Sequence, residues 1–252
     1  MWVWSTRRRL DDPHGTTSLF ETIGLAGVNE VYLSVNGGVL DDPRLATLLT
    51  SLVTRGVRVE ALAGEATWGR LENVPKVFAV IDAVAAFNAR SKARFAAVHL
   101  DIEPHQLAEN RSDHAFVPEL AAVLRVARER ASGAGLSTSA DLPRFALDEH
   151  GALFAHAVER PFVMLYQLRD PSSEWLARQS ASVLRNTYAD VDASIDGRLV
   201  IGLRVDDYPL DLSEKLVALD ETFGGRALRY GGWAIHDETK YRASLEASAP
   251  GR

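Results

Sequence analysis

Short apolar stretches rich in β-branched residues alternate eight times with longer segments of helical periodicity, and this alternation constrains the fold most. Strands that alternate with helices along a chain pair in parallel and are buried on both faces. The predicted strands span residues 2–5, 30–35, 57–63, 97–103, 136–140, 162–166, 199–203 and 228–235.

The segments between these strands carry the start signals of helices. Ser18 and Glu21 have the spacing of a capping box, which predicts a helix over residues 19–26. Asp-Pro pairs at 42–43 and 170–171 predict two more helix starts, because Asp caps a helix and Pro favours its first position. Further helices are predicted at about residues 77–87, 117–132, 148–159 and 212–223, with a short last helix after Asp237.

Eight such units in 252 residues match the usual size of a (β/α)8 TIM barrel. An open, doubly wound sheet is the alternative, but no Gly-x-Gly-x-x-Gly sequence follows the first predicted strand. No linker, low-complexity tract or block of like charge divides the chain. We therefore predict an α/β protein in which residues 1–252 form a single (β/α)8 TIM barrel.

Composition narrows the classes of function. A net charge of −6 gives no basis for binding nucleic acid or an anionic membrane, and the absence of cysteine excludes thiolate catalysis. The apolar runs are too short to span a bilayer, and the first residues lack the pattern of a signal peptide. We expect a cytoplasmic protein that uses no cofactor and takes a small-molecule or oligosaccharide substrate.

The predicted strand over residues 97–103 carries an unusual set of ionisable side chains. Because strand side chains alternate between faces, His99, Asp101 and Glu103 share one face, while Val98 and the other apolar residues share the opposite one. Buried charge is costly unless it is paired, bound to a metal or used in chemistry. This strand is therefore the first candidate for the active site.

In TIM barrels the active site lies at the carboxyl ends of the strands, so residues that follow each predicted strand are candidates for the site. Carboxylates, arginines and tryptophans gathered at one mouth suit a polyhydroxylated ligand. The predicted substrate-binding residues are Trp4, Asn36, Glu65, Trp68, His105, Asp141, Tyr166, Gln167, Arg204, Asp206 and Trp233. Arg144 and His236 follow the ends of the fifth and eighth strands.

Several of these residue types have structural interpretations as well. His99 lies deepest on its strand, which favours a hydrogen-bonded core histidine over a ligand. Trp2 and Trp4 alternate on the first strand, which favours packing in the barrel floor, and Asp170 before Pro171 is a typical helix cap. Glu103 is different, because it ends a core strand at the predicted mouth, directly before a proline.

Asp-Ile-Glu-Pro at residues 101–104 resembles the Asp-x-Glu strand of chitinase-like, family 18 glycoside hydrolases. It is most similar to uncharacterised barrel glycosidases that combine this sequence with a Trp-x-Trp first strand, found here at Trp2 and Trp4. Met-Leu-Tyr at 164–166 resembles the family's sixth strand, and Gly-Trp at 232–233 resembles its eighth. The family's strand-four pattern has two further acids, where this chain has Ala96 and His99.

The resemblance implies a barrel hydrolase in which Glu103 is the general acid and Asp101 its partner. Tyr166 would hold the reacting substituent of the substrate, and Trp233 would form the floor of the sugar site. In the family an Asp follows the tyrosine of the sixth strand, whereas this chain has Gln167.

Two neighbouring carboxyl groups push their pKa values apart, so that one stays ionised while the other keeps its proton. We expect Glu103 at the rim to be the protonated acid and Asp101 to stay charged, supported by His99 if that ring is protonated. A second carboxylate across the mouth, from Glu65, Asp141 or Asp206, would set retention or inversion. A substrate-assisted route needs no such partner, and both routes stay open.

Two other functions use the same strand. His99, Asp101, Glu103 and His105 could bind a divalent metal in a lyase, isomerase or cyclase, although Pro104 breaks the strand alternation. A sugar-binding barrel without catalysis is the third possibility, and it would need no acid at Glu103.

Overall fold

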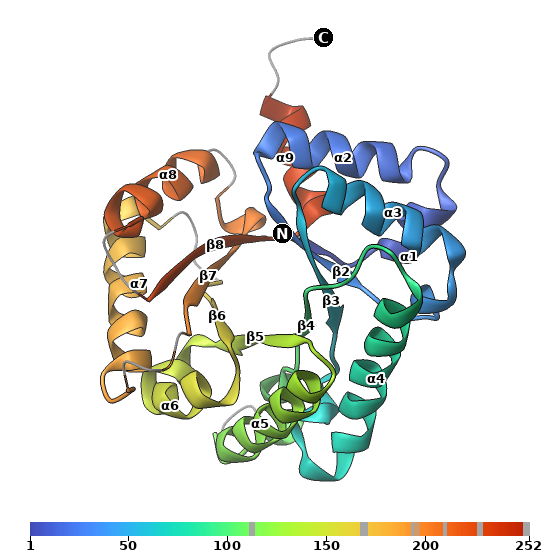
Figure 1. Cartoon of the computed structure of the whole chain (residues 1–252). Coiled ribbons are helices and arrows are strands. Elements are labelled where there is room, and N and C mark those ends of the chain that lie inside the picture. Colours follow the sequence, from blue (N-terminus) through green and yellow to red (C-terminus); the bar gives the residue numbers. More distant parts are fainter. Residues whose placement is uncertain are drawn as a thin grey trace.

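Eight parallel strands lie side by side in chain order from β1 to β8, and helices surround them (Figure 1). The computed structural model describes residues 1–110, 114–166, 171–192, 195, 197–208, 211–225 and 229–248. The predicted (β/α)8 TIM barrel is confirmed. The strands are β1 (Trp2–Val3), β2 (Glu30–Ser34), β3 (Arg58–Ala63), β4 (Ala97–Leu100), β5 (Ser137–Pro143), β6 (Arg160–Met164), β7 (Leu199–Arg204) and β8 (Tyr230–His236).

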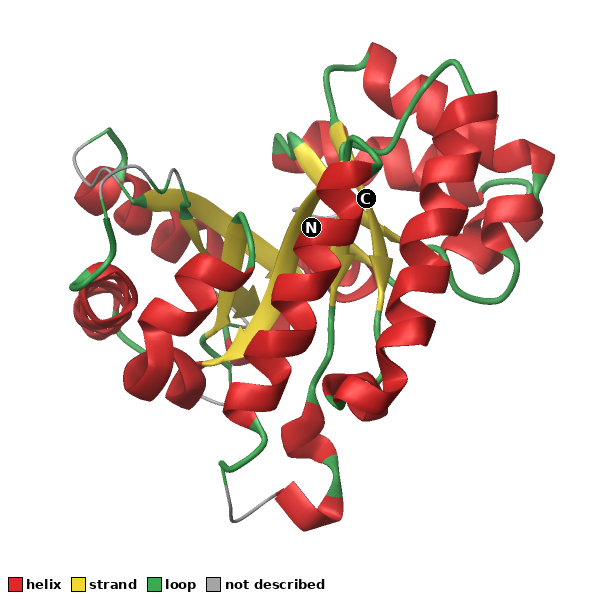
Figure 2. Ribbon diagram, turned by 60° about the horizontal axis from the view of Figure 1, so that its bottom comes forward, coloured by secondary structure: helices red, strands yellow, loops and turns green. Residues whose placement is uncertain are grey.

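Helices cover the outside of the barrel, as the turned view in Figure 2 also shows. No helix in the described ranges is both long and apolar enough to cross a bilayer. The helices are α1 (Thr6–Asp11), α2 (Gly15–Ala26), α3 (Pro43–Thr54), α4 (Val74–Arg90), α5 (Val117–Gly133), α6 (Arg144–Ala157), α7 (Ser173–Tyr188), α8 (Leu212–Phe223) and α9 (Glu238–Ser248).

The sequence signals for helix starts succeed at α3 and fail at α2. The Asp42 side chain accepts a hydrogen bond from the Arg44 amide (2.9 Å), and Pro43 is the first helical residue, as the Asp-Pro pair predicts. Helix α2 instead begins at Gly15, so Ser18 is not its cap. Ser18 Oγ donates to the Gly15 carbonyl (3.2 Å) and accepts from Arg9 (2.8 Å), which explains why the capping-box prediction is wrong.

Other boundaries differ by a few residues. Strand β4 ends at Leu100 rather than 103, and β1 has only two residues because α1 follows it at once. Helix α6 begins earlier than predicted and has non-helical backbone at His150. Helix α7 is capped by Ser172, whose Oγ accepts from the Trp175 amide (3.1 Å), while the predicted cap Asp170 lies outside the described residues.

Strand alternation divides the apolar side chains into two cores. On β4, Val98 and Leu100 point outward into the large layer between strands and helices, and both are fully buried. A smaller cluster fills the inside of the barrel, and its members are Trp2, Tyr32, Leu62, Phe162, Val200 and Ala234. Barrel interiors are packed with side chains rather than open, so this cluster closes the barrel beneath the mouth.

The connection after β3 lies directly against the end of β4. The Asp101 amide donates to the Ala63 carbonyl (3.0 Å), which extends the contact between these strands beyond Leu100. A Cβ atom on Gly64 would lie 1.8 Å from the Asp101 carbonyl oxygen, so only glycine fits at this position. The backbone of Asp101 is therefore held in place by the neighbouring loop.

Substitution of Gly64 by Ala is expected to lower the free energy of unfolding by roughly 1–3 kcal/mol, because the new methyl group overlaps the Asp101 backbone. The measurement is urea unfolding followed by circular dichroism. Gly24→Ala is the matched control, since a Cβ there meets nothing within 4 Å. Because Gly24 is an exposed position of α2, the control should leave the free energy of unfolding unchanged or raise it by up to about 1 kcal/mol. Equal behaviour of the two variants would contradict the close approach.

Candidate active site

A cavity of about 790 Å³ lies at the carboxyl ends of β4 to β8. Its walls combine carboxylates with two arginines, two histidines and a tyrosine, which is the composition of a site for a polar ligand. The lining residues are Asp101, Glu103, His105, Gln106, Asp141, Pro143, Arg144, Phe145, Asp148, Met164, Tyr166, Arg204 and His236.

Glu103 lies at the edge of this cavity, in the turn between β4 and the short 3-10 helix Pro104–Gln106. One of its oxygens lies 3.5 Å from His105 Nε2, and the other accepts from the Gln106 side chain. Burial, with a further contribution from the Asp141 carboxylate, raises the pKa of Glu103 to about 7. Burial also lowers the pKa of His105, so this imidazole gives Glu103 no fixed positive charge.

Asp101 is the deeper member of the predicted pair. Its Oδ1 atom is buried and has no hydrogen-bond partner. Burial, Asp141 and Glu103 together raise the pKa of Asp101 well above its usual range. This upward shift favours the protonated form of Asp101, against the expectation that it stays charged with support from His99.

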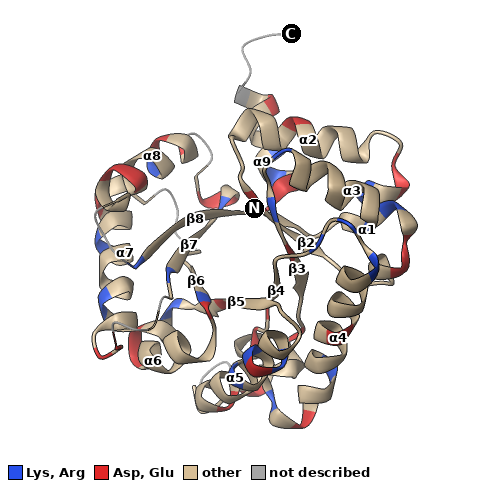
Figure 3. Ribbon diagram, viewed as in Figure 1, with Lys and Arg blue, Asp and Glu red and all other residues tan. Residues whose placement is uncertain are grey.

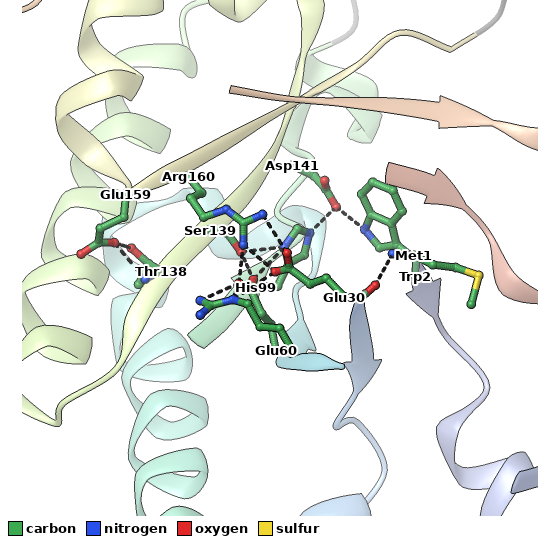
Figure 4. Close-up of polar contacts among 11 residues, drawn as sticks. Met1, Trp2, Glu30, Glu60, His99, Thr138, Ser139, Asp141, Glu159 and Arg160 are labelled. Atoms are coloured by element: carbon green, nitrogen blue, oxygen red, sulfur yellow. Dashed lines mark hydrogen bonds and ion pairs between the residues drawn. The ribbon is translucent and has the colours of Figure 1, made fainter. Parts of the chain in front are cut away.

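His99 instead supports Asp141, the residue that follows Ala140 on the neighbouring strand β5 (Figure 4). The Asp141 Oδ2 atom accepts from His99 Nε2 (2.9 Å) and from Trp2 Nε1 (2.9 Å). On the other side of the ring, Nδ1 lies 2.7 Å from Ser139 Oγ, which donates to Glu60 (2.5 Å). Both ring nitrogens therefore donate, and His99 is an imidazolium ion.

The charge of His99 depends on two buried carboxylates. Desolvation alone would lower its pKa, but Asp141 and Glu60 reverse this and raise it to about 9. This agrees with the hydrogen-bond pattern and with the sequence-based interpretation of His99 as a core histidine. Its ring stacks on Tyr32, with centroids 4.5 Å apart, inside the barrel.

Below His99, the buried ions continue to the amino ends of the strands. Arg160 bridges Glu60 (2.9 Å) and both oxygens of Glu30 (2.5 and 2.9 Å), and Arg58 adds a contact to Glu60 (3.1 Å). Glu60 is fully buried, and its pKa lies well below the usual range because His99 and Arg160 outweigh the desolvation. We call Glu30, Arg58, Glu60, His99, Asp141 and Arg160 the interior ion network.

The far wall of the cavity comes from β6, β7 and β8. Burial and nearby carboxylates raise the pKa of Tyr166 well above its usual range, so its hydroxyl stays a hydrogen-bond donor. Arg204 pairs with Asp207 (2.6 Å), although its Nε is buried without a partner. Burial lowers the pKa of His236, whose Nε2 accepts from Trp4 Nε1 (3.1 Å). Unpaired donors and acceptors in such a wall are available to a ligand.

Both predicted catalytic residues, Asp101 and Glu103, line this cavity. Four of the predicted substrate-binding residues line it as well: His105, Asp141, Tyr166 and Arg204. Trp4 lies at its border through its contact with His236. Gln167 lies outside the described residues.

Three predicted residues after β2 and β3 lie elsewhere. Asn36 and Trp68 line a separate surface pocket of about 460 Å³ that is bounded by α4. Glu65 is exposed and does not line the cavity. The connections after β2 and β3 contain short 3-10 turns that pack near α4. The expectation that residues after each strand line the active site does not anticipate this.

Two further predicted residues face away from the cavity. Trp233 packs in the outer layer, where its Nε1 donates to Asp220 on α8 (3.0 Å). Its neighbour Ala234 occupies the barrel interior, so alternation places the Trp233 ring outside. Asp206 is exposed and pairs with Lys240. The expectation that Trp233 forms the floor of the site is therefore not met.

Sequence reasoning missed several residues of the site and its support. Gln106, Phe145 and Asp148 lie in helical segments that follow strand ends, so the strand pattern gave no signal for them. Glu60 had a signal, since it is a charge in the middle of an otherwise apolar strand.

The metal-binding alternative requires His99, Asp101, Glu103 and His105 to converge. Both nitrogens of His99 are already used by Ser139 and Asp141 inside the barrel. Within the part of the chain that the structure describes, no three His, Asp or Glu side chains are arranged to hold a metal ion.

The imidazolium form of His99 predicts a pH dependence of stability. Its folded pKa of about 9 exceeds the ordinary 6.5, so its stabilisation is complete below about 6.5 and is lost as pH rises through 9. The loss is on the order of 3 kcal/mol in the free energy of unfolding. Urea unfolding at pH 6.5 and 9.5 measures it. His99→Gln should lack most of this fall, whereas exposed His156→Gln should retain it; parallel behaviour of both variants would contradict a charged His99.

Comparison with known proteins places the fold. No protein-family model and no curated protein sequence matches the chain. A chitinase from Chromobacterium violaceum superposes with a TM-score of 0.58 at 12% identity, covering 96% of this chain and 97% of that one.

Two further structures give the same result. The glycoside hydrolase domain of PgaB (BpsB) from Bordetella bronchiseptica has a TM-score of 0.57 at 13% identity, covering 96% of this chain and 93% of that domain. A GH18 chitinase from Pseudoalteromonas aurantia has a TM-score of 0.58 at 10% identity, with 91% and 96% covered. The resemblance to chitinase-like barrels is thus confirmed at the level of the fold: this chain has the TIM-barrel fold of these glycoside hydrolases.

Proposed function

We propose that this protein is a glycoside hydrolase in which Glu103 is the general acid and Asp101 its supporting carboxyl group. The observation that carries the proposal is Glu103 itself, a half-buried carboxyl group at the edge of a large polar cavity with a pKa raised to about 7. An acid that is still protonated near neutral pH can donate to a leaving oxygen at physiological pH.

The chemistry follows from the requirements of glycosidic cleavage. As the bond from the anomeric carbon to the leaving oxygen breaks, that oxygen gains negative charge and needs a proton. Glu103 supplies the proton from the rim, where a leaving group can depart toward solvent. Water supplies the hydroxyl group that replaces the leaving group on the anomeric carbon, and the remaining proton of that water restores the acid form of Glu103. Asp101 lies two residues deeper on the same chain segment and, in its protonated form, donates a hydrogen bond to the substrate or to Glu103.

Similar structures support the substrate class of this proposal. Chitinases and a β-glucosidase, which superposes with a TM-score of 0.58 at 11% identity and 94% and 88% coverage, are among the similar structures. Together with the donors and acceptors of Tyr166, Arg204 and His236, this supports a carbohydrate as the substrate. A sugar-binding barrel without catalysis shares the same wall, so the test must measure bond cleavage.

Glu103→Gln is expected to lower kcat/KM by about 10²–10⁴-fold on glycosides with alkyl leaving groups, because these need protonation. With 2,4-dinitrophenyl glycosides the loss should be much smaller, since that leaving group departs as an anion. A panel of glucosides and N-acetylglucosaminides, with product release measured by chromatography and absorbance, provides the assay.

Glu65→Gln is the matched control, because Glu65 is an exposed carboxylate in the connection after the neighbouring strand and lies outside the cavity. Its activity should equal that of the unmodified protein. If Glu103→Gln and Glu65→Gln cleave alkyl glycosides equally well, Glu103 is not the acid.

The pH profile offers an independent check. Because the acid form of Glu103 is required and its pKa is about 7, kcat/KM should fall as pH rises above 7, approaching tenfold per pH unit. The measurement is the initial rate on an alkyl glycoside between pH 5 and 9. A profile that stays flat up to pH 9 would rule out Glu103 as the proton donor.

A further inference from the structure

Asp141 lies at the boundary between two groups of ionisable side chains with opposite characters. Toward the barrel interior it contacts His99 and Trp2, each at 2.9 Å through Oδ2. Toward the mouth it lines the same cavity as Asp101 and Glu103, and its Oδ1 is buried without a partner. The parallel register pairs Leu100 with Ala140, so Asp101 and Asp141 follow at the same level of the barrel.

The interior side is balanced in charge. The interior ion network holds three carboxylates, at Glu30, Glu60 and Asp141, and three cations, at Arg58, His99 and Arg160. Figure 4 shows Ser139 between His99 and Glu60, and Trp2 bonded to Asp141. Asp141 is the member of the network that reaches the cavity. Because its Oδ2 is held by an imidazolium ion and an indole N–H, its negative charge is fixed in position.

The mouth side lacks such balance. The charged and titratable groups that line the cavity with Glu103 are Asp101 (following β4), His105 (Pro104–Gln106), Asp141 (β5), Arg144 and Asp148 (α6), Tyr166 (following β6), Arg204 (β7) and His236 (β8). Arg144 is paired with Asp148 at 3.0 Å and Arg204 with Asp207 at 2.6 Å, so neither cation is directed to Glu103. His105 and His236 are partly buried and neutral at pH 7.

We propose that Asp141 is a positioning residue, a fixed negative charge at the floor of the cavity that acts on Glu103 and thereby sets the pH range in which the acid works. The inference rests on the proposed function of Glu103, and it assigns to the barrel interior a task in catalysis. His99 and Trp2 hold the Asp141 carboxylate from the barrel interior, and Glu103 lies on its cavity side. Burial and Asp141 are the two causes that raise the pKa of Glu103, and Asp141 also raises that of Asp101.

The direct test is titration of the Glu103 carboxyl carbon by ¹³C NMR between pH 4 and 9, with the signal assigned from its absence in Glu103→Gln. In Asp141→Asn the amide keeps the shape of the side chain and removes its charge. The titration midpoint of Glu103 should then fall by about one pH unit, the effect of one nearby charge at a partly buried site.

Asp148→Asn is the matched control, because Asp148 is a carboxylate of the same cavity whose charge is paired with Arg144. It should move the midpoint by less than about 0.3 pH unit. The proposal is overturned if Asp141→Asn leaves the midpoint unchanged, or if Asp148→Asn lowers it equally.

A second variant protects the test against misfolding, since Asp141→Asn leaves the His99 cation short of one partner. The double variant His99→Gln/Asp141→Asn removes the ion pair as a unit and leaves no new unpaired charge. Its Glu103 midpoint should also fall, because Asp141 and not His99 acts on Glu103. An unchanged midpoint in this variant would equally overturn the proposal.

Activity then separates this inference from the proposed function. If Glu103 is the acid, the alkaline limb of kcat/KM on an alkyl glycoside should move down in pH together with the NMR midpoint. If the midpoint moves while the limb does not, Asp141 controls Glu103 but Glu103 is not the acid. If neither the midpoint nor the limb moves, the role of Asp141 is wrong while the acid function of Glu103 survives.

Discussion

The ion pair between His99 and Asp141 joins the interior of the barrel to its mouth, and the rest of the site depends on it. Without the Asp141 and Glu60 carboxylates, burial would leave His99 neutral; with them, its pKa rises to about 9. The imidazolium ion in turn donates a 2.9 Å hydrogen bond to the side chain of Asp141, which is only 2% exposed. This carboxylate lines the same cavity as Asp101 and Glu103, and together with burial it raises the pKa of both.

The interior ion network extends from the amino ends of the strands into the buried interior of the barrel. Glu30 and Arg160 are the first residues of their strands and lie where solvent approaches the amino ends, whereas Glu60 and His99 are fully buried. Aromatic rings of Trp2, Tyr32 and Phe162 fill the space around His99. Figure 3 shows that most other charged residues lie on the outer helices and loops, where water solvates them. Electrostatic interactions between ions that aromatic rings enclose are strong, because water does not screen them.

Alternation and strand order predict most of this architecture from the sequence. They place His99, Asp101 and Glu103 on one face of the predicted fourth strand because period-two patterning depends only on local backbone geometry. In the structure β4 ends at Leu100, so Asp101 and Glu103 lie just beyond the strand. Alternation and strand order fail for Trp233, where the phase of the last strand puts Ala234 inside, and for Asn36 and Trp68, whose loops pack near α4. The partners of His99 were also out of reach, because the contacts to Glu60 and Asp141 join residues about 40 positions apart.

The properties of the candidate acid therefore depend on residues from more than one strand. The segment that follows β4 supplies two carboxyl groups, but their pKa values are raised by burial and by Asp141 on β5. A pair of carboxylates alone would leave either member free to hold the proton. Because Asp141 lies at the level of Asp101 and lines the same cavity as Glu103, its charge raises the pKa of both groups. Under the proposed function, a leaving group at the rim then meets the acid form of Glu103, as proton donation requires.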